Sequence, residues 1–283
     1  MIRAAGESIT SAPREKSCAH GHGRFPSQHL SGHNHRMAIA PTPASTAPAT
    51  KTERILCALD IGGTHAKAKC PHWESKREVD SGTAYTPQQL VIDLTAMLAG
   101  EKVDAITIGL PAPIAEGRPL RDPVNLGPGW KDFDYRAAFG VPVKFLNDAA
   151  MQAIGSHRAA GLTTEKMLFL GLGTGLGACM IVGRDVLPME LAHLPYRKGK
   201  SFEDFVGVRG KERMGTRKWR GHVAECVKIL SAALLPDVVV LGGGNSKALK
   251  ELPPKCVLGA NSNAFLGGFA VWEPEWSSAA TQL

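Results

Sequence analysis

The sequence lacks the features that mark membrane-spanning and disulfide-rich proteins. It contains no run of roughly 18 apolar residues, so no transmembrane helix is expected. Its six cysteines are scattered without any C-x-x-C pair. Cys57 and Cys179 lie inside apolar, strand-like runs, which is typical of buried thiols in a reducing compartment. We therefore expect a cytoplasmic protein that contacts no membrane.

Acidic residues are scarce near the N-terminus, and this explains most of the net charge. The chain carries +7, of which residues 1–51 contribute +4 through six Lys and Arg against two Asp and Glu. The rest of the chain is nearly balanced. The high isoelectric point is thus mainly a property of this segment, and we predict no nucleic-acid partner.

Residues 1–51 also lack hydrophobic periodicity and are rich in Pro, Ser, Ala, Gly and His. We predict a disordered N-terminal extension. Its five histidines are interpreted as chance composition, with a weak metal-binding tract as the alternative. The segment is acid-poor, as transit peptides are, yet it has no clear amphipathic helix. A true start at Met37 is a further alternative, and the sequence leaves these possibilities open.

The remaining chain shows one order of elements twice: a strand, a glycine-rich turn, further strands and a helix. This predicts a duplicated α/β fold with a cleft between an N-terminal lobe, residues 52–147, and a C-terminal lobe, residues 148–283, whose last segment could return to the first lobe. The predicted strands cover 55–60, 65–70, 78–81, 105–110, 141–146 and 238–241, with a hairpin over 166–182. The predicted helices cover 87–98, 133–139, 149–160, 223–235 and the stretch up to 249, while 117–130 is predicted as loop and 264–272 as helix or strand.

The segment 55–67 has the pattern of a phosphate-binding turn. Paired glycines let the backbone approach a ligand and point its N–H groups at an anion. An acid beside such a cradle repels phosphate unless a cation lies between them, so Asp60 suggests Mg²⁺. A hairpin turn that merely needs glycine is the alternative. The candidate residues are Asp60, Gly62, Gly63, Thr64 and Lys67.

Two more glycine-rich loops follow predicted strands. Three such loops in one chain are harder to explain as turns alone, and they suit a polyanion such as a nucleoside triphosphate that is gripped from two lobes. Their candidate residues are Gly173, Thr174, Gly175 and Gly177 in the second loop, and Gly242, Gly243, Gly244 and Asn245 in the third.

Asn147 and Asp148 form the candidate reaction centre. An aspartate at the carboxyl end of a strand can accept the proton of a substrate hydroxyl that attacks phosphorus. Asn147 can hold a neighbouring hydroxyl. The alternative, that Asp148 simply caps the helix beginning at Ala149, is equally favoured by the local sequence.

Three further polar residues are candidates for holding sugar hydroxyls. Glu190 and His193 are three positions apart and share a face if that turn is helical. Glu203 offers another acceptor. An ordinary surface pair and a solvated helix-start acid are the alternatives. Residues 209–220 hold six Lys and Arg against one Glu, which would attract a polyphosphate or form a solvated surface.

Taken together and in order, these motifs resemble those of the ROK family of sugar kinases. DIGGT at 60–64 is similar to the family's first phosphate loop, and LNDA at 146–149 to its catalytic Asn-Asp pair. GLGTGLG at 171–177 resembles the second phosphate loop and LGGGN at 241–245 the adenosine-side loop. Within the family, the segments 190–207 and 252–273 resemble the polyphosphate glucokinase branch.

The resemblance implies the two-lobed actin-like ATPase (ribonuclease H-like) fold with an interlobe cleft. It implies a homodimer that transfers a phosphoryl group from polyphosphate or ATP to the 6-hydroxyl of glucose. Asp148 would be the general base and Asp60 would orient Mg²⁺ indirectly. The sugar would be held by Asn147, Glu190, His193 and Glu203. A non-catalytic sugar-binding protein or a sugar-responsive regulator of the same family is the alternative.

The sequence departs from the family pattern at three places. Residues 196–201 contain no cysteine, where many family members bind zinc, so no structural zinc is predicted. Ala192 replaces a usual glycine, at a cost of about 1 kcal/mol if that position needs positive φ. His65 stands where a small residue is common. The last two changes put catalytic efficiency in question, though not the fold.

Overall fold

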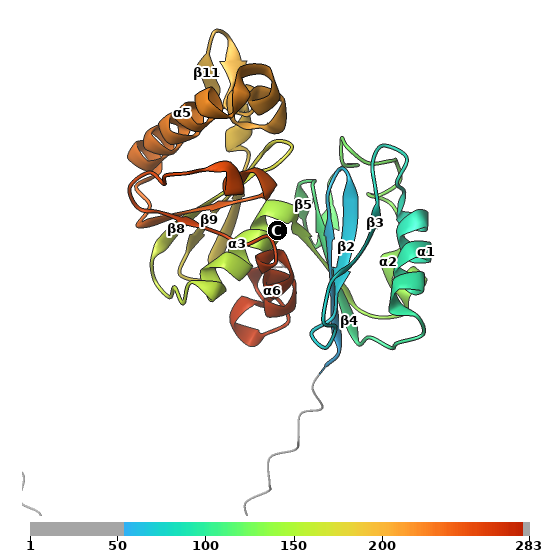
Figure 1. The fold of residues 1–283 in the computed structure, drawn as a ribbon. Helices are drawn as coiled ribbons and strands as arrows, with labels where there is room; N and C mark the ends of the chain where they lie inside the picture. Colours follow the sequence, from blue (N-terminus) through green and yellow to red (C-terminus); the bar gives the residue numbers. More distant parts are fainter. Residues whose placement is uncertain (1–53, 280–283) are drawn as a thin grey trace, which may run out of the picture. The chain divides into compact units, whose positions relative to one another are not determined.

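The computed structural model describes residues 54–279 of the chain (Figure 1). The predicted N-terminal extension, residues 1–51, and the alternative start at Met37 lie outside this range. Within residues 54–279, no helix is long and apolar enough to cross a membrane.

The first sheet has five strands in the order β3-β2-β1-β4-β7. Its central strand β1 pairs antiparallel with β2 and parallel with β4, and β4 pairs parallel with β7. Because the parallel strands point the same way, Asp60 of β1 and Asn147 of β7 lie at the same edge of the sheet. The strands are β1 (Leu56–Ile61), β2 (His65–Lys69), β3 (Arg77–Asp80), β4 (Ala105–Leu110) and β7 (Val143–Asn147), with a small hairpin of β5 (Ile114–Ala115) and β6 (Arg118–Pro119).

Helix α1 (Pro87–Leu98) packs beside this sheet and has the predicted bounds. The Thr86 hydroxyl accepts a hydrogen bond from the Gln89 N–H, and Pro87 takes the first position, where its missing N–H is harmless. The helix ends at Ala99, which adopts the left-handed conformation. Its apolar face buries Leu90, Leu94 and Met97. A shorter helix, α2 (Tyr135–Phe139), precedes β7.

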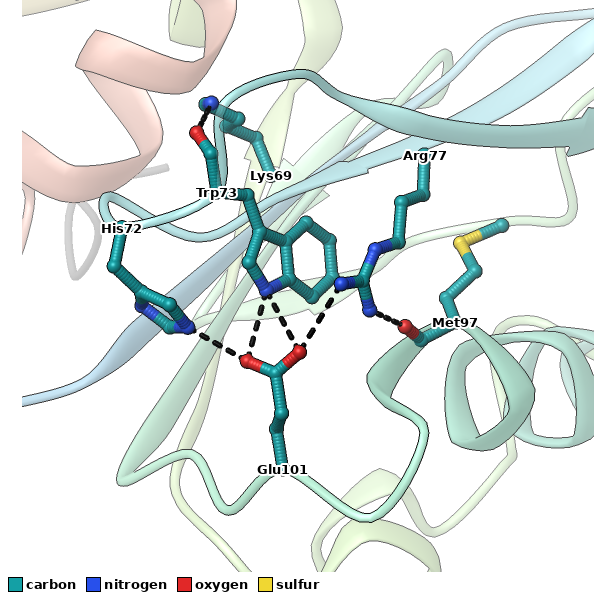
Figure 2. Close-up of polar contacts among 6 residues, drawn as sticks. All are labelled: Lys69, His72, Trp73, Arg77, Met97 and Glu101. Atoms are coloured by element: carbon teal, nitrogen blue, oxygen red, sulfur yellow. Dashed lines mark hydrogen bonds and ion pairs between the residues drawn. The ribbon is translucent and has the colours of Figure 1, made fainter.

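A polar cluster around Glu101 ties the turn after α1 to the connection between β2 and β3 (Figure 2). The Trp73 indole N–H donates to both Glu101 oxygens, at 3.1 and 2.9 Å. His72 Nε2 lies 2.6 Å from Oε2, and Arg77 Nη2 donates to Oε1 at 3.1 Å. Arg77 also donates to the Met97 carbonyl and lies over the Trp73 ring. The carboxylate thus joins two side chains of this connection, and Arg77 at the start of β3, to the end of a helix.

The second sheet also has five strands, in the order β10-β9-β8-β13-β14. Strands β8 and β9 form the predicted hairpin, whose innermost pair is Leu172 with Leu176. Alternate residues of β8 face opposite sides: Met167 and Phe169 join one core cluster, and Leu168 and Leu170 the other. The strands are β8 (Lys166–Leu172), β9 (Leu176–Val182), β10 (Asp185–Met189), β13 (Val238–Gly242) and β14 (Cys256–Leu258).

Helix α3 (Asp148–Ala159) covers the first of these faces and packs against α6 (Asn263–Ala270) (Figure 1). The two helices touch so closely that a methyl group on Gly155 would lie 1.7 Å from the Asn263 carbonyl oxygen. Thr107 of β4 donates to the Gly268 carbonyl at 2.6 Å, so α6 is bonded to the first sheet as well. The division of residues 52–283 into lobes between 147 and 148 stays a prediction.

Helix α5 (Val208–Leu234) covers the other face, with Trp219, Val223 and Leu230 buried against it. It merges the predicted basic run and the predicted amphipathic helix into one element with a kink at Gly215, where φ is 78°. The short helix α4 (Glu203–Val206) and a hairpin of β11 (Pro195–Arg197) and β12 (Lys200–Ser201) precede it. Tyr196 in this hairpin has its hydroxyl 3.0 Å from His222 Nδ1 of α5.

Several elements differ from the prediction. The helix expected up to residue 249 is a 3₁₀ helix, η2 (Gly244–Ala248), in which the Ser246 hydroxyl donates to the Gly243 carbonyl. Strand β6 lies within the predicted loop 117–130. Strands β10 and β14 were not predicted, since each is a short edge strand and β10 contains Pro188, which an edge position tolerates.

Candidate active site

The three glycine-rich loops, although far apart in sequence, meet around one cavity of about 450 Å³, which we call the loop cavity. Gly242 does not line it, because this residue is buried in β13 with the Phe169 ring where a side chain would stand. The other predicted phosphate-binding residues all do: Asp60, Gly62, Gly63, Thr64, Lys67, Gly173, Thr174, Gly175, Gly177, Gly243, Gly244 and Asn245.

The first loop has little room for side chains. The Gly62 N–H donates to the His65 carbonyl at 2.9 Å, which closes the turn between β1 and β2. A methyl group on Gly63 would lie 3.1 Å from Cβ of Asn125 in the facing loop. His65 Nδ1 lies 3.0 Å from the Thr64 hydroxyl oxygen, so the unusual histidine engages the hydroxyl that was predicted to meet phosphate.

The second and third loops are bonded to each other. Asn245 donates from Nδ2 to the Gly173 carbonyl at 3.0 Å, and the Gly173 N–H donates to the Gly175 carbonyl at 3.1 Å. Gly243 has φ of 81°, and a methyl group there would lie 2.5 Å from the Leu172 carbonyl oxygen. Glycine is therefore required at this position both by the backbone conformation and by the close approach of β8.

A second cavity of about 490 Å³, which we call the hydroxyl cavity, adjoins the first. The two share Asp148, Thr174 and Gly175 among their lining residues. The hydroxyl cavity brings together all the predicted sugar-holding residues, which come from β7, the segment after β10 and helix α4: Asn147, Glu190, His193 and Glu203. Asp148 thus stands at the junction of the two cavities.

The helix cap is Asn147 and not Asp148. The Asn147 side-chain oxygen accepts from the Ala149 and Ala150 N–H groups, at 3.0 and 3.2 Å. Helix α3 begins at Asp148, whose Oδ1 accepts from the Ala149 N–H at 2.8 Å. The capping alternative for Asp148 is therefore wrong. One amide N–H of Asn147 donates to the Ala112 carbonyl at 3.4 Å, and the residue lines the hydroxyl cavity.

Burial and like charge act together on the two aspartates. Burial, followed by the charge of Asp60 and then that of Glu190, raises the pKa of Asp148 to about 6. Burial also raises the pKa of Asp60, against the opposing effect of Lys67, whose Nζ lies 3.6 Å from Asp60 Oδ2. The anionic forms of both groups would gain from an added cation. A basic group with a pKa near neutrality is suited to accept a proton from a hydroxyl.

The residues fit a magnesium ion that is shared with a phosphate ligand. Within the described range no group of three His, Cys, Asp or Glu side chains could hold a metal alone. Mg²⁺ commonly binds through one or two carboxylates together with substrate phosphates, so it needs no such group. Asp60 lines the loop cavity and is the carboxylate in question.

The remaining polar residues of the hydroxyl cavity are open to solvent. Glu190 precedes the 3₁₀ helix η1 (Leu191–His193) and His193 ends it. Their side chains are 63% and 71% exposed, and Glu190 Oε2 lies 3.7 Å from His193 Nε2. Glu203 lies 3.5 Å from the Arg209 guanidinium. Ala192 is buried and is not among the described residues with positive φ, so the expected backbone strain is absent.

Sequence reasoning missed Asn125, which lines both cavities. It belongs to the stretch predicted only as loop. This loop is fixed by Asp122, whose two oxygens accept from the N–H groups of Gly129 and Lys131 at 3.0 and 3.1 Å. An asparagine among prolines and glycines gave no local signal, because its position opposite Gly63 is set only by the folded chain.

The chain is similar to known proteins of one family. The profile of the ROK family matches residues 56–188. Polyphosphate glucokinase from Mycobacterium leprae (strain TN) is 27% identical over 223 residues, covering 72% of this chain and 68% of that protein. Polyphosphate glucokinase from Mycobacterium tuberculosis (strain CDC 1551 / Oshkosh) is 25% identical over 235 residues, covering 77% and 88%.

Among solved structures, the inorganic polyphosphate/ATP-glucomannokinase from Arthrobacter sp. strain KM matches with a TM-score of 0.66 and 22% identity. The match covers 76% of this chain and 97% of that one. It confirms the predicted α/β class and the actin-like ATPase fold, which is built here from two five-stranded mixed sheets.

Proposed function

Since this chain belongs to the ROK family, we propose that it is a sugar kinase that transfers a phosphoryl group from inorganic polyphosphate or ATP to the 6-hydroxyl of glucose. One observation carries the proposal: a partly buried aspartate with a raised pKa stands between a cavity lined by glycine-rich loops and a cavity lined by carboxylates, an amide and an imidazole. The first suits phosphates and the second suits hydroxyls.

In this mechanism Asp148 is the general base. It accepts the proton of the 6-hydroxyl as that oxygen attacks the terminal phosphorus of the donor. The bond between this phosphorus and the bridging oxygen breaks, and the shortened donor leaves with the electron pair. The position of Asp148 at the junction of the two cavities and its pKa of about 6 suit this role.

The loops and the cation hold the donor. The backbone N–H groups of the glycine-rich loops, the Thr64 hydroxyl and the Lys67 ammonium group would contact phosphate oxygens. Mg²⁺, when bound near Asp60 together with the donor, would neutralise charge on the phosphates. Lys67 Nζ lies 3.6 Å from Asp60 Oδ2 and both residues line the loop cavity, which supports a role for both beside the phosphates.

The sugar is held on the other side of Asp148. Asn147 offers its amide group, and Glu190, Glu203 and His193 offer acceptors and donors for adjacent hydroxyls. Glucose is proposed as the acceptor from the names of the similar glucokinases. A homodimer is proposed on family resemblance alone.

The test is glucose 6-phosphate formation by the purified protein with Mg²⁺, with polyphosphate, ATP or no donor. Turnover with either donor supports the proposal, and the ratio of the two kcat/KM values identifies the preferred one. No turnover with either donor, while glucose still binds in a calorimetric titration, would support the non-catalytic sugar-binding alternative.

A further inference from the structure

We propose that a basic groove along α5 binds the distal phosphates of a long polyphosphate chain whose near end lies in the loop cavity. The inference rests on the proposed function, because it assigns a path to one of the two proposed donors. The groove is a third cavity, of about 590 Å³, lined by Arg217 and Arg220 of α5 and by Lys250 after η2. We call it the α5 groove.

The cations of the α5 groove are available to an outside anion. Four arginines elsewhere in residues 54–279 form ion pairs with carboxylates, namely Arg77, Arg158, Arg184 and Arg209. Within the same range, Arg217, Arg220 and Lys250 have no carboxylate oxygen within 4.0 Å. Glu251 also lines the groove, so the three cations outnumber its acids by two.

The α5 groove is connected to the loop cavity through η2. Asn245, at the start of this 3₁₀ helix, lines the loop cavity, and its side-chain oxygen accepts from Lys211 Nζ at 2.8 Å. Ala248, at the other end, has its carbonyl 2.6 Å from Arg220 Nε. The basic residues of α5 therefore follow η2 from the loop cavity to the groove, with Lys211 between the two.

The length of this path separates long donors from short ones. A donor whose terminal phosphorus lies beside Asp148 must cross the loop cavity and then pass the 5 residues of η2, roughly 10 Å at the rise of a 3₁₀ helix, before it reaches the α5 groove. The two P–O–P links of tripolyphosphate do not span this distance from the loop cavity. A chain of many phosphates does, and phosphate binding of this kind is driven by released counterions.

The basic run 209–220 is thus divided by the fold. Arg209 pairs with Glu203 in the hydroxyl cavity. Arg213 donates to the Asp204 carbonyl at 2.5 Å and lies over the Phe205 ring, away from η2. The remaining basic side chains contact η2 or line the α5 groove, except Lys218, which is exposed and lines none of the three cavities described here.

The experiment uses the double variant Arg217→Gln with Lys250→Gln, since neither side chain makes a hydrogen bond that holds η2. The control, Lys218→Gln with Lys228→Gln, removes the same charge from exposed positions of α5. Steady-state kinetics are measured with glucose and Mg²⁺ and three donors: long-chain polyphosphate, tripolyphosphate and ATP.

If the α5 groove binds polyphosphate, KM for long-chain polyphosphate should rise roughly fivefold to tenfold in the double variant Arg217→Gln with Lys250→Gln. KM for tripolyphosphate and for ATP should stay within about twofold of the wild-type values. The control variant should change all three by less than about twofold. An equal rise for short and long donors would show a general charge effect and overturn the proposal, as would no rise at all.

A direct measurement of polyphosphate binding tests the α5 groove independently of whether the protein is a kinase. If no donor supports turnover, titration of the wild type with long-chain polyphosphate and with tripolyphosphate still tests the α5 groove. Tighter binding of the long chain that is lost only in the groove variant supports the groove without the kinase. Equal binding of both polymers by all three proteins contradicts it.

Discussion

Two carboxylates in this protein have opposite surroundings. Glu101 receives hydrogen bonds from Trp73, His72 and Arg77, in that order of effect, and these hold its pKa at about 2 (Figure 2). Asp148 receives hydrogen bonds from the backbone N–H groups of Ala149 and of its own residue. Burial, and after it the charges of Asp60 and Glu190, nevertheless raise its pKa to about 6. The surroundings of Glu101 therefore favour its ionised form, while those of Asp148 favour its protonated form.

The difference separates a carboxylate that stabilises the fold from one that is available for chemistry. Glu101 binds three donors from residues 72–77, so its charge is balanced by contacts that join this segment to the turn after α1. Asp148 lines both cavities, and burial together with the neighbouring negative charges disfavours its ionised form. Strongly shifted groups of the second kind are typical of functional sites.

The largest expected effect follows from Asp148→Asn. Removal of a general base lowers kcat by roughly 10²- to 10⁴-fold. Asn keeps the shape and the acceptor for the Ala149 N–H, so glucose affinity should change by less than about threefold. Kinetics and calorimetric titration of glucose check the two parts. Turnover within about tenfold of the wild type would show that Asp148 is not the base.

The pH profile is the second prediction. Asp148 must be deprotonated to act, so kcat/KM should rise with pH through an apparent pKa near 6. Asp60→Asn removes the charge that raises this pKa, and the acid limb should therefore move to lower pH, in addition to a lower rate. Asp185→Asn, on the edge strand β10, is the control and should leave the limb in place. A limb that does not move in Asp60→Asn would contradict the coupling of the two aspartates.

Glu101→Gln is the third prediction and tests the other carboxylate. Because the folded-state pKa of Glu101 is depressed, its stabilising effect is present above the unfolded pKa near 4.5 and is lost as pH falls toward 2. The variant should lower Tm by roughly a few degrees at pH 7, with a difference that shrinks below pH 4 and an unchanged kcat. Glu74→Gln, at an exposed position of the same connection, should have no effect. A Tm difference that is constant from pH 7 to pH 3 would refute the role of the charge.

The smallest expected effect concerns His65. Its ring engages the Thr64 hydroxyl, so His65→Ala should free this donor and lower KM for the phosphoryl donor by about twofold to threefold. The same change in a Thr64→Val background should bring no gain. If both backgrounds improve equally, the effect does not pass through the Thr64 hydroxyl.

The elements that could be predicted have recognisable features in their own local sequence. Helix α1 has a capping threonine, a proline at its first position and a regular apolar face, and its bounds were predicted correctly. The β8–β9 hairpin has two apolar runs around a glycine-rich turn, and it too was confirmed.

The parts that were not predictable depend on the folded chain. Asn147 and Asp148 are both good caps, and local sequence cannot tell which one the strand places at the helix start. Asn125 reaches the site only because Asp122 fixes its loop. Likewise, most of the basic residues of the run 209–220 are divided between the hydroxyl cavity, η2 and the α5 groove. This division depends on how α5 packs against η2.

The most direct test of the account is the pH dependence of stability for wild type and Asp148→Asn, measured by urea unfolding between pH 4 and pH 8. A pKa of about 6 in the folded state against about 3.8 in the unfolded state means that folding favours the protonated form. Stability from this group is therefore present below pH 4 and is lost as pH rises through 6. The account predicts that the variant is more stable than the wild type by on the order of 2 kcal/mol at pH 8, with the gap closing toward pH 4. A variant that is less stable at pH 8, or a gap that does not change with pH, would contradict it.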